Sequence, residues 1–172
     1  MGIHGTRRQF LTSVGAAAAA IQTFEHIGPY GVLAADTANL KEVVRPFYTD
    51  CLTVNTRADV AATMNRLLAD DFQSINIAET KGKAQLIGQI QFFWKLIPNL
   101  KWDIQEMLQD GNKVIVRSIA SGSPKGEFMG LNLDGSKSFE IMTIDIHTIE
   151  GQQIKQVYHL EEWPTAIKQL KG

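Results

Sequence analysis

Two residues with acid–base side chains, Asp145 and His159, stand in the last two segments of the chain that alternate apolar and polar residues. These segments, residues 138–149 and 153–163, are separated by residues 150–152, whose composition is typical of a hairpin turn. We therefore expect Asp145 and His159 on adjacent antiparallel strands, at about the same level. If both face one side of the sheet, Asp145 can fix the tautomer of the imidazole and raise its basicity. A slip of one residue in the register would place one of them on the opposite face.

A histidine and a carboxylate in this relation are suited to proton transfer at carbon. Such a transfer needs a base whose pKa lies near the working pH, in a site that excludes water. The pKa of imidazole starts near 6.5, whereas a carboxylate needs burial to raise its pKa by about two units. Structural roles are the alternatives. His159 can fill space near a pocket mouth, and Asp145 can be a buried carboxylate held by a partner such as Arg117.

A second histidine, His147, stands two residues from Asp145 and therefore shares its strand face. It is a candidate ligand-binding residue, with a solvent-exposed position near the turn as the alternative. The spacing of these polar groups matches no zinc motif, so we predict no metal site.

Aromatic and amide side chains on the inner stripes of the expected helices and strands are candidates for the wall of a ligand pocket. They are Tyr48, Asn76, Phe93, Trp94, Trp102, Phe128, Met129 and Tyr158. Packing in the core is the alternative for each of them. As a group they indicate a small hydrophobic molecule as ligand, held by few polar contacts. We expect Glu161 and Glu162, beside Trp163, to be charges at the rim.

The spacing of apolar residues predicts helices first and strands afterwards. Helices are expected over residues 38–51, interrupted by Pro46, over 56–68, opened by a capping box at residues 56–59, and over 83–96. Period-two segments then predict strands at residues 72–77, 100–108, 113–121, 138–149 and 153–163, a strand or loop at 126–133, and a terminal helix at 165–171. This order predicts an α+β domain whose helices cover one face of a curved antiparallel sheet.

Residues 1–34 have the layout of a cleavable twin-arginine export signal. Arg7 and Arg8 are followed by Phe10 and Leu11 and then by an Ala-rich stretch. The apolar stretch over residues 10–24 is shorter than the ~20 residues that span a bilayer. We therefore predict export to the periplasm or the exterior, with cleavage after Ala34. We also predict no further membrane association and a single domain over residues 35–172.

The charge balance of the expected mature chain excludes a nucleic-acid partner. Without Arg7, Arg8 and Glu25, 15 basic and 17 acidic residues remain, a net charge of −2. A nucleic-acid surface would require a basic face. Cys51 is the single cysteine, so no intrachain disulfide can form.

Several segments together resemble the SnoaL-like polyketide cyclases, a branch of the nuclear-transport-factor-2-like superfamily. They are Leu68-Ala-Asp-Asp-Phe72, Phe92-Phe-Trp-Lys-Leu-Ile-Pro98, Gly126-Glu-Phe-Met-Gly-Leu131, Thr143-Ile-Asp-Ile-His147 and Glu150-Gly-Gln-Gln-Ile154. The resemblance runs from about Val43 to the end of the chain. It implies a cone-shaped curved antiparallel sheet packed on three N-terminal helices, as in a cystatin-like α+β barrel. Proteins of this superfamily include cyclases, isomerases, dehydratases and proteins that only bind.

In the cyclases, an Asp on the last long strand acts as general acid and base for an intramolecular aldol closure, and no metal or organic cofactor is needed. Laying residues 153–164 over that strand places His159 where this Asp would be. The resemblance therefore implies an exported, cofactor-independent cyclase, isomerase or lyase that acts on a small carbonyl compound through His159 and Asp145. The alternative is a non-catalytic periplasmic small-molecule-binding or accessory protein of the same fold. A homodimer formed through the exposed face of the sheet is expected in either case.

Overall fold

A computed structural model of the chain describes residues 39–172. The export signal and the cleavage site that we predict within residues 1–34 lie outside the described residues. In the order of the chain, the elements are α1 (Lys41–Pro46), η1 (Phe47–Leu52), α2 (Val60–Leu67), β1 (Leu68–Ile75), β2 (Thr80–Gly82), α3 (Lys83–Leu96), β3 (Lys101–Asp110), β4 (Lys113–Gly122), β5 (Lys125–Phe128), β6 (Leu131–Asp134), β7 (Phe139–Glu150), β8 (Gln153–Glu161) and α4 (Trp163–Lys171).

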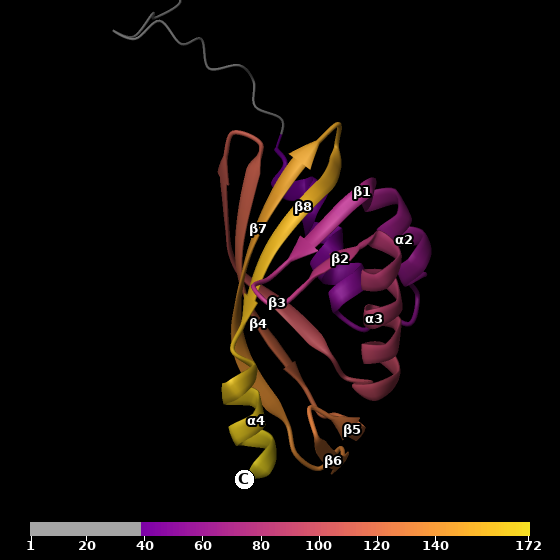
Figure 1. The fold of residues 1–172 in the computed structure, drawn as a ribbon, viewed down its shortest axis with the longest axis vertical. Coiled ribbons are helices and arrows are strands. Elements are labelled where there is room, and N and C mark those ends of the chain that lie inside the picture. Colours follow the sequence, from indigo (N-terminus) through magenta and orange to yellow (C-terminus); the bar gives the residue numbers. More distant parts are fainter. Residues whose placement is uncertain (1–38) are drawn as a thin grey trace, which may run out of the picture. The chain divides into compact units, whose positions relative to one another are not determined.

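A curved six-stranded sheet carries α2 and α3 on one side (Figure 1). Its strand order is β2-β1-β8-β7-β4-β3, and β5 and β6 form a separate hairpin. The α+β class with a curved sheet and covering helices, predicted from the sequence, is confirmed. The pairing of β1 with β8 is parallel, however, and the other pairings are antiparallel. Because β2 and β3 are edge strands, the sheet does not close into the barrel that the resemblance implied.

The first predicted helix is divided at Pro46, as the sequence indicated. Proline has no N–H to donate to the carbonyl group of the preceding turn. Beyond it the chain continues as the π-helix η1, at whose end the Thr53 N–H donates to the Tyr48 carbonyl, five residues earlier, at 3.0 Å. This wider winding buries Phe47, Tyr48, Cys51 and Leu52 together, and so places Tyr48 against the sheet.

Two boundaries near α2 differ from the sequence-based expectation. The helix begins at Val60 rather than at residue 56, because Asp59 is the N-cap and its Oδ1 accepts the Ala62 N–H at 3.0 Å. β1 begins at Leu68 rather than at residue 72, since Leu68 already pairs with Ile154 of β8. The register then shifts before Gln73, which explains why residues 69–71 break the alternating pattern.

The register of β7 and β8 decides which side chains share a face. Alternate residues of β7, including Thr143, Asp145 and His147, are buried on the helix side. Asp145 lies directly opposite His159 in the β7–β8 pairing, so the predicted level of these two residues is confirmed. Pro164, expected to close the last strand, lies instead in the first turn of α4.

Two further features concern the β5–β6 hairpin and the helices. Phe128, on the β5–β6 hairpin, stacks on Phe139, and both rings lie against Trp163. Of the helices within residues 39–172, none is long and apolar enough to cross a membrane.

Candidate functional site

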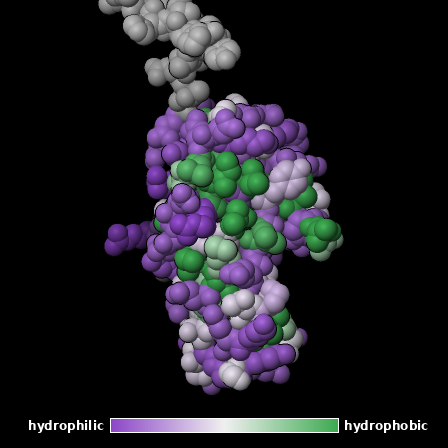
Figure 2. Space-filling model, turned by 90° about the vertical axis from the view of Figure 1, so that its left-hand side faces the viewer, coloured by the Kyte–Doolittle hydropathy of each residue, from purple (hydrophilic) through white to green (hydrophobic). Residues whose placement is uncertain are grey.

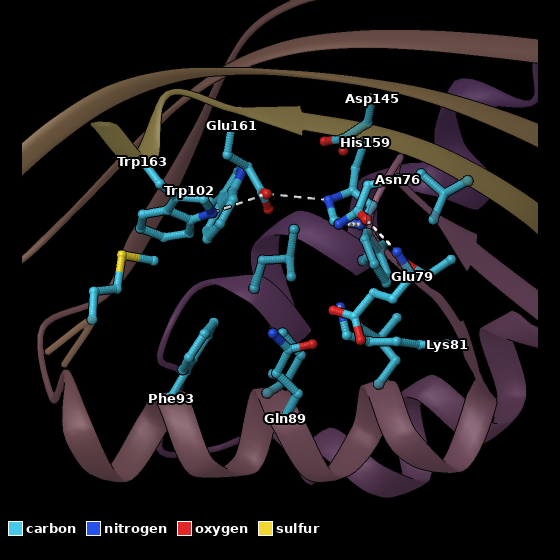
Figure 3. Close-up of a pocket in the computed structure, with 17 residues that line it drawn as sticks. Asn76, Glu79, Lys81, Gln89, Phe93, Trp102, Asp145, His159, Glu161 and Trp163 are labelled. Atoms are coloured by element: carbon cyan, nitrogen blue, oxygen red, sulfur yellow. Dashed lines mark hydrogen bonds and ion pairs between the residues drawn. The ribbon is translucent and has the colours of Figure 1, made fainter. Parts of the chain in front are cut away.

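A cavity of about 250 Å³ lies between the inner face of the sheet and the helices η1 and α3. One end carries aromatic side chains, among them Phe93, Trp102 and Trp163 (Figure 3). Met129, from the β5–β6 turn, also lines the cavity. The wall also carries the apolar side chains of Phe47, Leu52, Leu86, Ile90 and Val157. Its polar and charged side chains are Ser74, Asn76, Glu79, Lys81, Gln89, Asp145, His159 and Glu161.

The hydrogen bonds around His159 determine which ring nitrogen carries the proton. Asn76 accepts the backbone N–H groups of Ala78 and Glu79 on its Oδ1, at 2.9 Å each, so its amide nitrogen faces His159. That nitrogen lies 3.4 Å from Nε2 of His159 and can only donate. In the neutral ring Nε2 therefore carries the lone pair, and the proton sits on Nδ1.

Glu161 is the carboxylate that orients the imidazole. Its Oε2 lies 3.2 Å from Nδ1 of His159 and also accepts the indole N–H of Trp163 at 3.1 Å. The hydrogen bond to Glu161 raises the pKa of His159 above its ordinary value of 6.5, with partial burial acting in the opposite direction. This is the geometry of a base whose tautomer and ring plane are held by a second group.

Asp145 lines the same cavity but has a different partner. The Tyr48 hydroxyl donates to its Oδ2 at 2.6 Å, and no hydrogen bond joins Asp145 to His159 in the described part of the chain. Burial raises the pKa of Asp145 to about 7, although the Tyr48 hydrogen bond lowers it. The predicted Asp145–His159 dyad is therefore wrong as a hydrogen-bonded pair. Arg117, the structural partner suggested by the sequence, pairs instead with Glu106.

Tyr48 and His147 lie behind Asp145 in the core, and neither lines the cavity. Nε2 of His147 lies 2.8 Å from the Tyr48 hydroxyl, and its Nδ1 has no partner among the described residues. Burial lowers the pKa of His147 to about 3, so the ring is neutral at ordinary pH. When Asp145 is ionised, Tyr48 donates its single proton to Asp145 and accepts the Nε2–H of His147. Both residues, predicted to contact the ligand, support Asp145 from behind.

The other residues predicted for the pocket wall fall into two groups. Asn76, Phe93, Trp102 and Met129 line the cavity as expected. Trp94, Phe128 and Tyr158 do not. Trp94 donates its indole N–H to the Cys51 carbonyl at 2.8 Å, Phe128 is buried among other rings, and Tyr158 is 47 % exposed on the outer face of the sheet.

Trp102 is held in place by a short polar chain. Its indole N–H donates to Thr143 Oγ1 at 3.1 Å, and that oxygen lies 2.6 Å from Ser118 Oγ. Both hydroxyl groups are buried, so the indole of Trp102 has a defined orientation at the aromatic end of the cavity.

Of the polar lining residues, Ser74, Glu79, Lys81 and Gln89 were missed from the sequence, and the role of Glu161 was underestimated. Glu79 and Lys81 reach the cavity because the short strand β2 pairs with the end of β1. A three-residue polar strand has no pattern that predicts it. Gln89 was overlooked as a polar position on the otherwise apolar face of α3. Glu161 had a readable signal, because residues two apart on a strand share a face and it stands two residues after His159.

The model of the SnoaL-like polyketide cyclase family matches residues 42–170. The chain belongs to this family. No curated protein matches the sequence at a significant level.

Solved structures of SnoaL-like and related proteins share the fold. One from Jannaschia sp. CCS1, assigned to the SnoaL-like polyketide cyclases, has a TM-score of 0.69 and 15 % identity, over 77 % of this chain and 92 % of that chain. IdmH from Streptomyces antibioticus, described as a candidate polyketide cyclase, has a TM-score of 0.66 and 19 % identity, over 78 % and 99 %. AclR from Streptomyces galilaeus, described as a candidate hydroxylase, has a TM-score of 0.67 and 13 % identity, over 78 % and 97 %.

The cavity of this SnoaL-like protein brings two titratable groups onto one wall. His159 presents a lone pair on Nε2, and Asp145 presents a carboxyl group that stays protonated up to about pH 7. Among residues 39–172, no three His, Cys, Asp or Glu side chains are grouped so that they could hold a metal ion. The arrangement can accept a proton at one point and donate a hydrogen bond at another.

Proposed function

We propose that this SnoaL-like protein catalyses proton transfer at the carbon next to a carbonyl group of a small substrate, as an isomerase, cyclase or lyase. The observation that carries the proposal is the tautomer of His159. Glu161 holds the proton on Nδ1, and Asn76 faces the lone pair on Nε2. At 3.4 Å the contact with Asn76 is long, so a substrate C–H can replace it at little loss of hydrogen bonding.

His159 and Asp145 have complementary parts in the proposed reaction. Nε2 of His159 takes the proton from carbon, and the electron pair of the C–H bond moves into an enolate. A protonated Asp145 donates a hydrogen bond to the enolate oxygen, where the negative charge develops. Keeping a carboxylic acid neutral near pH 7 by burial is an established way to make such a donor. The proton then returns to a second carbon, or the enolate carbon attacks another carbonyl of the same molecule and His159 protonates the new alkoxide.

Two observations support the class of reaction and the size of the substrate. The family is described as SnoaL-like polyketide cyclases, and the description of IdmH points the same way. At ~30 Å³ for each water in the liquid, the cavity of about 250 Å³ has room for about eight waters. A substrate with one ring and a short carbonyl side chain is therefore of suitable size.

Exchange of an enolisable hydrogen is the direct test. Phenylpyruvate in D2O, followed by proton NMR with and without the purified protein, reports the rate at which the hydrogens next to its carbonyl are replaced. We expect the protein to accelerate this exchange and a heat-denatured sample to have no effect. Binding without any acceleration would instead favour the non-catalytic binding protein.

We also propose that the protein is exported by the twin-arginine pathway, on the strength of the pattern in residues 1–34. Replacing Arg7 and Arg8 together by Lys keeps the charge but removes the arginine pair. We expect the variant to stay in the cytoplasm at its full length, while the parent appears in the periplasm with Ala35 at its N-terminus. Cell fractionation, immunoblotting and N-terminal sequencing measure this. An Arg57→Lys variant is the control, and equal export of all three proteins would contradict the proposal.

A homodimer through the outer face of the sheet is the proposed assembly. Apolar residues gather in the upper half of this face (Figure 2). The patch includes Ile144 and Ile146 of β7 with Tyr158 and Leu160 of β8, and Leu160 is 71 % exposed. A second copy of the chain would bring an identical patch, so a two-fold axis through the patch would bury both copies at once.

A charge within the patch is expected to separate the subunits. Leu160→Glu should give a monomer in analytical ultracentrifugation at concentrations where the parent sediments as a dimer. Phe92→Glu is the control, because Phe92 is also exposed but lies on α3. A parent that is monomeric at high micromolar concentration would rule out this assembly.

A further inference from the structure

We infer that the cavity takes ligands that carry a carboxylate, and that Lys81 binds this group. The inference rests on the proposed function only in placing the substrate in the same cavity. The two ends of the cavity are chemically unlike (Figure 3). Trp102, Trp163 and Phe93 lie at one end, whereas Asn76, Glu79 and Lys81 lie at the other.

Lys81 is the single lysine or arginine among the lining residues of this cavity, all of which belong to the described part of the chain. Its side chain is only 13 % exposed, although lysine is among the residues that are least often buried. A buried ammonium group needs a partner of opposite charge. That partner is Glu79, which forms an ion pair with Lys81.

Glu79 can be displaced from its ion pair with Lys81. Its side chain is 53 % exposed and has no other ion-pair partner among residues 39–172. Because about half of the Glu79 side chain is exposed, its carboxylate can turn from the ion pair into water and be hydrated there. The carboxylate of a ligand can therefore take the place of Glu79, while Lys81 keeps a partner throughout.

Gln89 is a further polar residue of the cavity wall that can bind the ligand. It projects from α3 into the cavity, and its amide makes no hydrogen bond to another described residue (Figure 3). An amide nitrogen can donate to one oxygen of a carboxylate while the ammonium group pairs with the other.

The remaining carboxyl groups of the cavity do not repel an anion bound at the Lys81 end. Glu161 accepts hydrogen bonds from Trp163 and His159, close to the aromatic end. Asp145 is held by Tyr48, and burial keeps it largely protonated up to about pH 7. A ligand with an apolar ring among the tryptophans and a carboxylate at Lys81 would place its central atoms beside His159.

Calorimetric titration with two unreactive ligands of the same shape tests the inference without any turnover. trans-Cinnamate carries a carboxylate, and trans-cinnamamide replaces it by a neutral amide. We expect the full-length protein to bind cinnamate at least ten times more tightly than cinnamamide. Lys81→Met should abolish the preference and leave cinnamamide binding unchanged, whereas Lys81→Arg should keep it. Glu79→Gln should tighten cinnamate binding, because the competing carboxylate is gone.

Lys95→Met is the matched control, since Lys95 is exposed on α3 and does not line the cavity. Thermal unfolding of each variant checks that the fold is intact. Equal affinity for acid and amide, a preference that survives in Lys81→Met, or binding of neither ligand would overturn the inference. Because neither ligand exchanges protons at carbon, a protein that prefers cinnamate but fails to exchange phenylpyruvate would refute the proposed reaction alone.

Discussion

Replacing His159 by Ala is expected to lower the rate of phenylpyruvate exchange by about 10²–10⁴-fold, the usual contribution of a positioned general base. The other wall residues stay in place, so binding of cinnamate should change little. The effect should fall on kcat rather than on KM, because the lost interaction operates only in the transition state. NMR exchange rates at saturating substrate, together with calorimetry, separate the two quantities.

Gln156→Ala provides the control for this change. Gln156 stands on the same strand and pairs with Thr148, away from the cavity, so its removal should leave the rate unaltered. If His159→Ala exchanges substrate as fast as the parent does, His159 is not the base, and the protein retains the fold without the proposed chemistry.

Glu161→Gln separates the orienting role of Glu161 from direct contact with substrate. The hydrogen bond that Nδ1 of His159 donates to Glu161 is the largest cause that raises the pKa of His159, so replacing Glu161 should lower that pKa. The acidic limb of the kcat/KM profile should then move to lower pH, with a smaller rate on the plateau. A purely structural role would lower the rate without moving the limb.

The positions of Asp145 and His159 were readable from the sequence, whereas their partners were not. Alternation and the hairpin turn predicted both the strands and the level at which the two residues face each other, and the register of β7 and β8 agrees. Hydrogen bonding depends on which side chains reach each group from other layers. Tyr48 reaches Asp145 from η1, and its placement depends on the π-helix that follows Pro46.

The charged end of the cavity could not be predicted from the sequence, for a different reason. β2 is three residues long and takes its position from pairing with β1, not from its own propensity. The sequence pattern therefore did not mark Lys81 and Glu79 as cavity residues. Tyr158, by contrast, was predicted to line the cavity and does not. It stands next to His159 on β8, so the two-residue period of the strand directs it to the other face of the sheet.

We expect Asp145→Asn to remove a pH-dependent contribution of about 4 kcal/mol to the free energy of unfolding. The pKa of Asp145 is about 7 in the folded protein, against an ordinary value of 3.8. The folded protein keeps this proton between these two values, whereas the unfolded chain has lost it. The stability that Asp145 contributes is therefore fully present below pH 3.8 and is lost as the pH rises to about 7. The magnitude is about 4 kcal/mol, at 1.36 kcal/mol for each pH unit.

The contribution of His147 to stability depends on pH in the opposite direction. In the parent protein it offsets the loss of stability that Asp145 causes. Its pKa is about 3 in the folded protein, against an ordinary value of 6.5. The unfolded chain binds this proton first, so stability falls as the pH drops from 6.5 toward 3. Between pH 3.8 and 6.5 the two contributions have opposite slopes of one proton each. We therefore expect the parent to show a nearly flat stability over this range.

Urea unfolding at a series of pH values should reveal the His147 dependence in Asp145→Asn, whose stability should rise with pH up to about 6.5. Above that pH the raised pKa of His159 lowers the stability of both proteins as His159 loses its proton. His159 is present in both proteins, so the difference between them isolates Asp145. Asp71→Asn is the control. Asp71 is exposed and bonded to Lys155, which lowers its pKa, so any effect there should be small and of opposite sign.

The outcome bears directly on the proposed chemistry. A stability difference between parent and Asp145→Asn that is the same at pH 4 and pH 8 would mean that Asp145 is ionised in the folded protein across this range. An ionised Asp145 can accept hydrogen bonds but cannot donate one to an enolate oxygen. His159 would then have to supply every proton in the reaction. If the parent instead loses stability relative to Asp145→Asn as the pH rises toward 7, Asp145 remains the hydrogen-bond donor, held from behind by Tyr48 and His147.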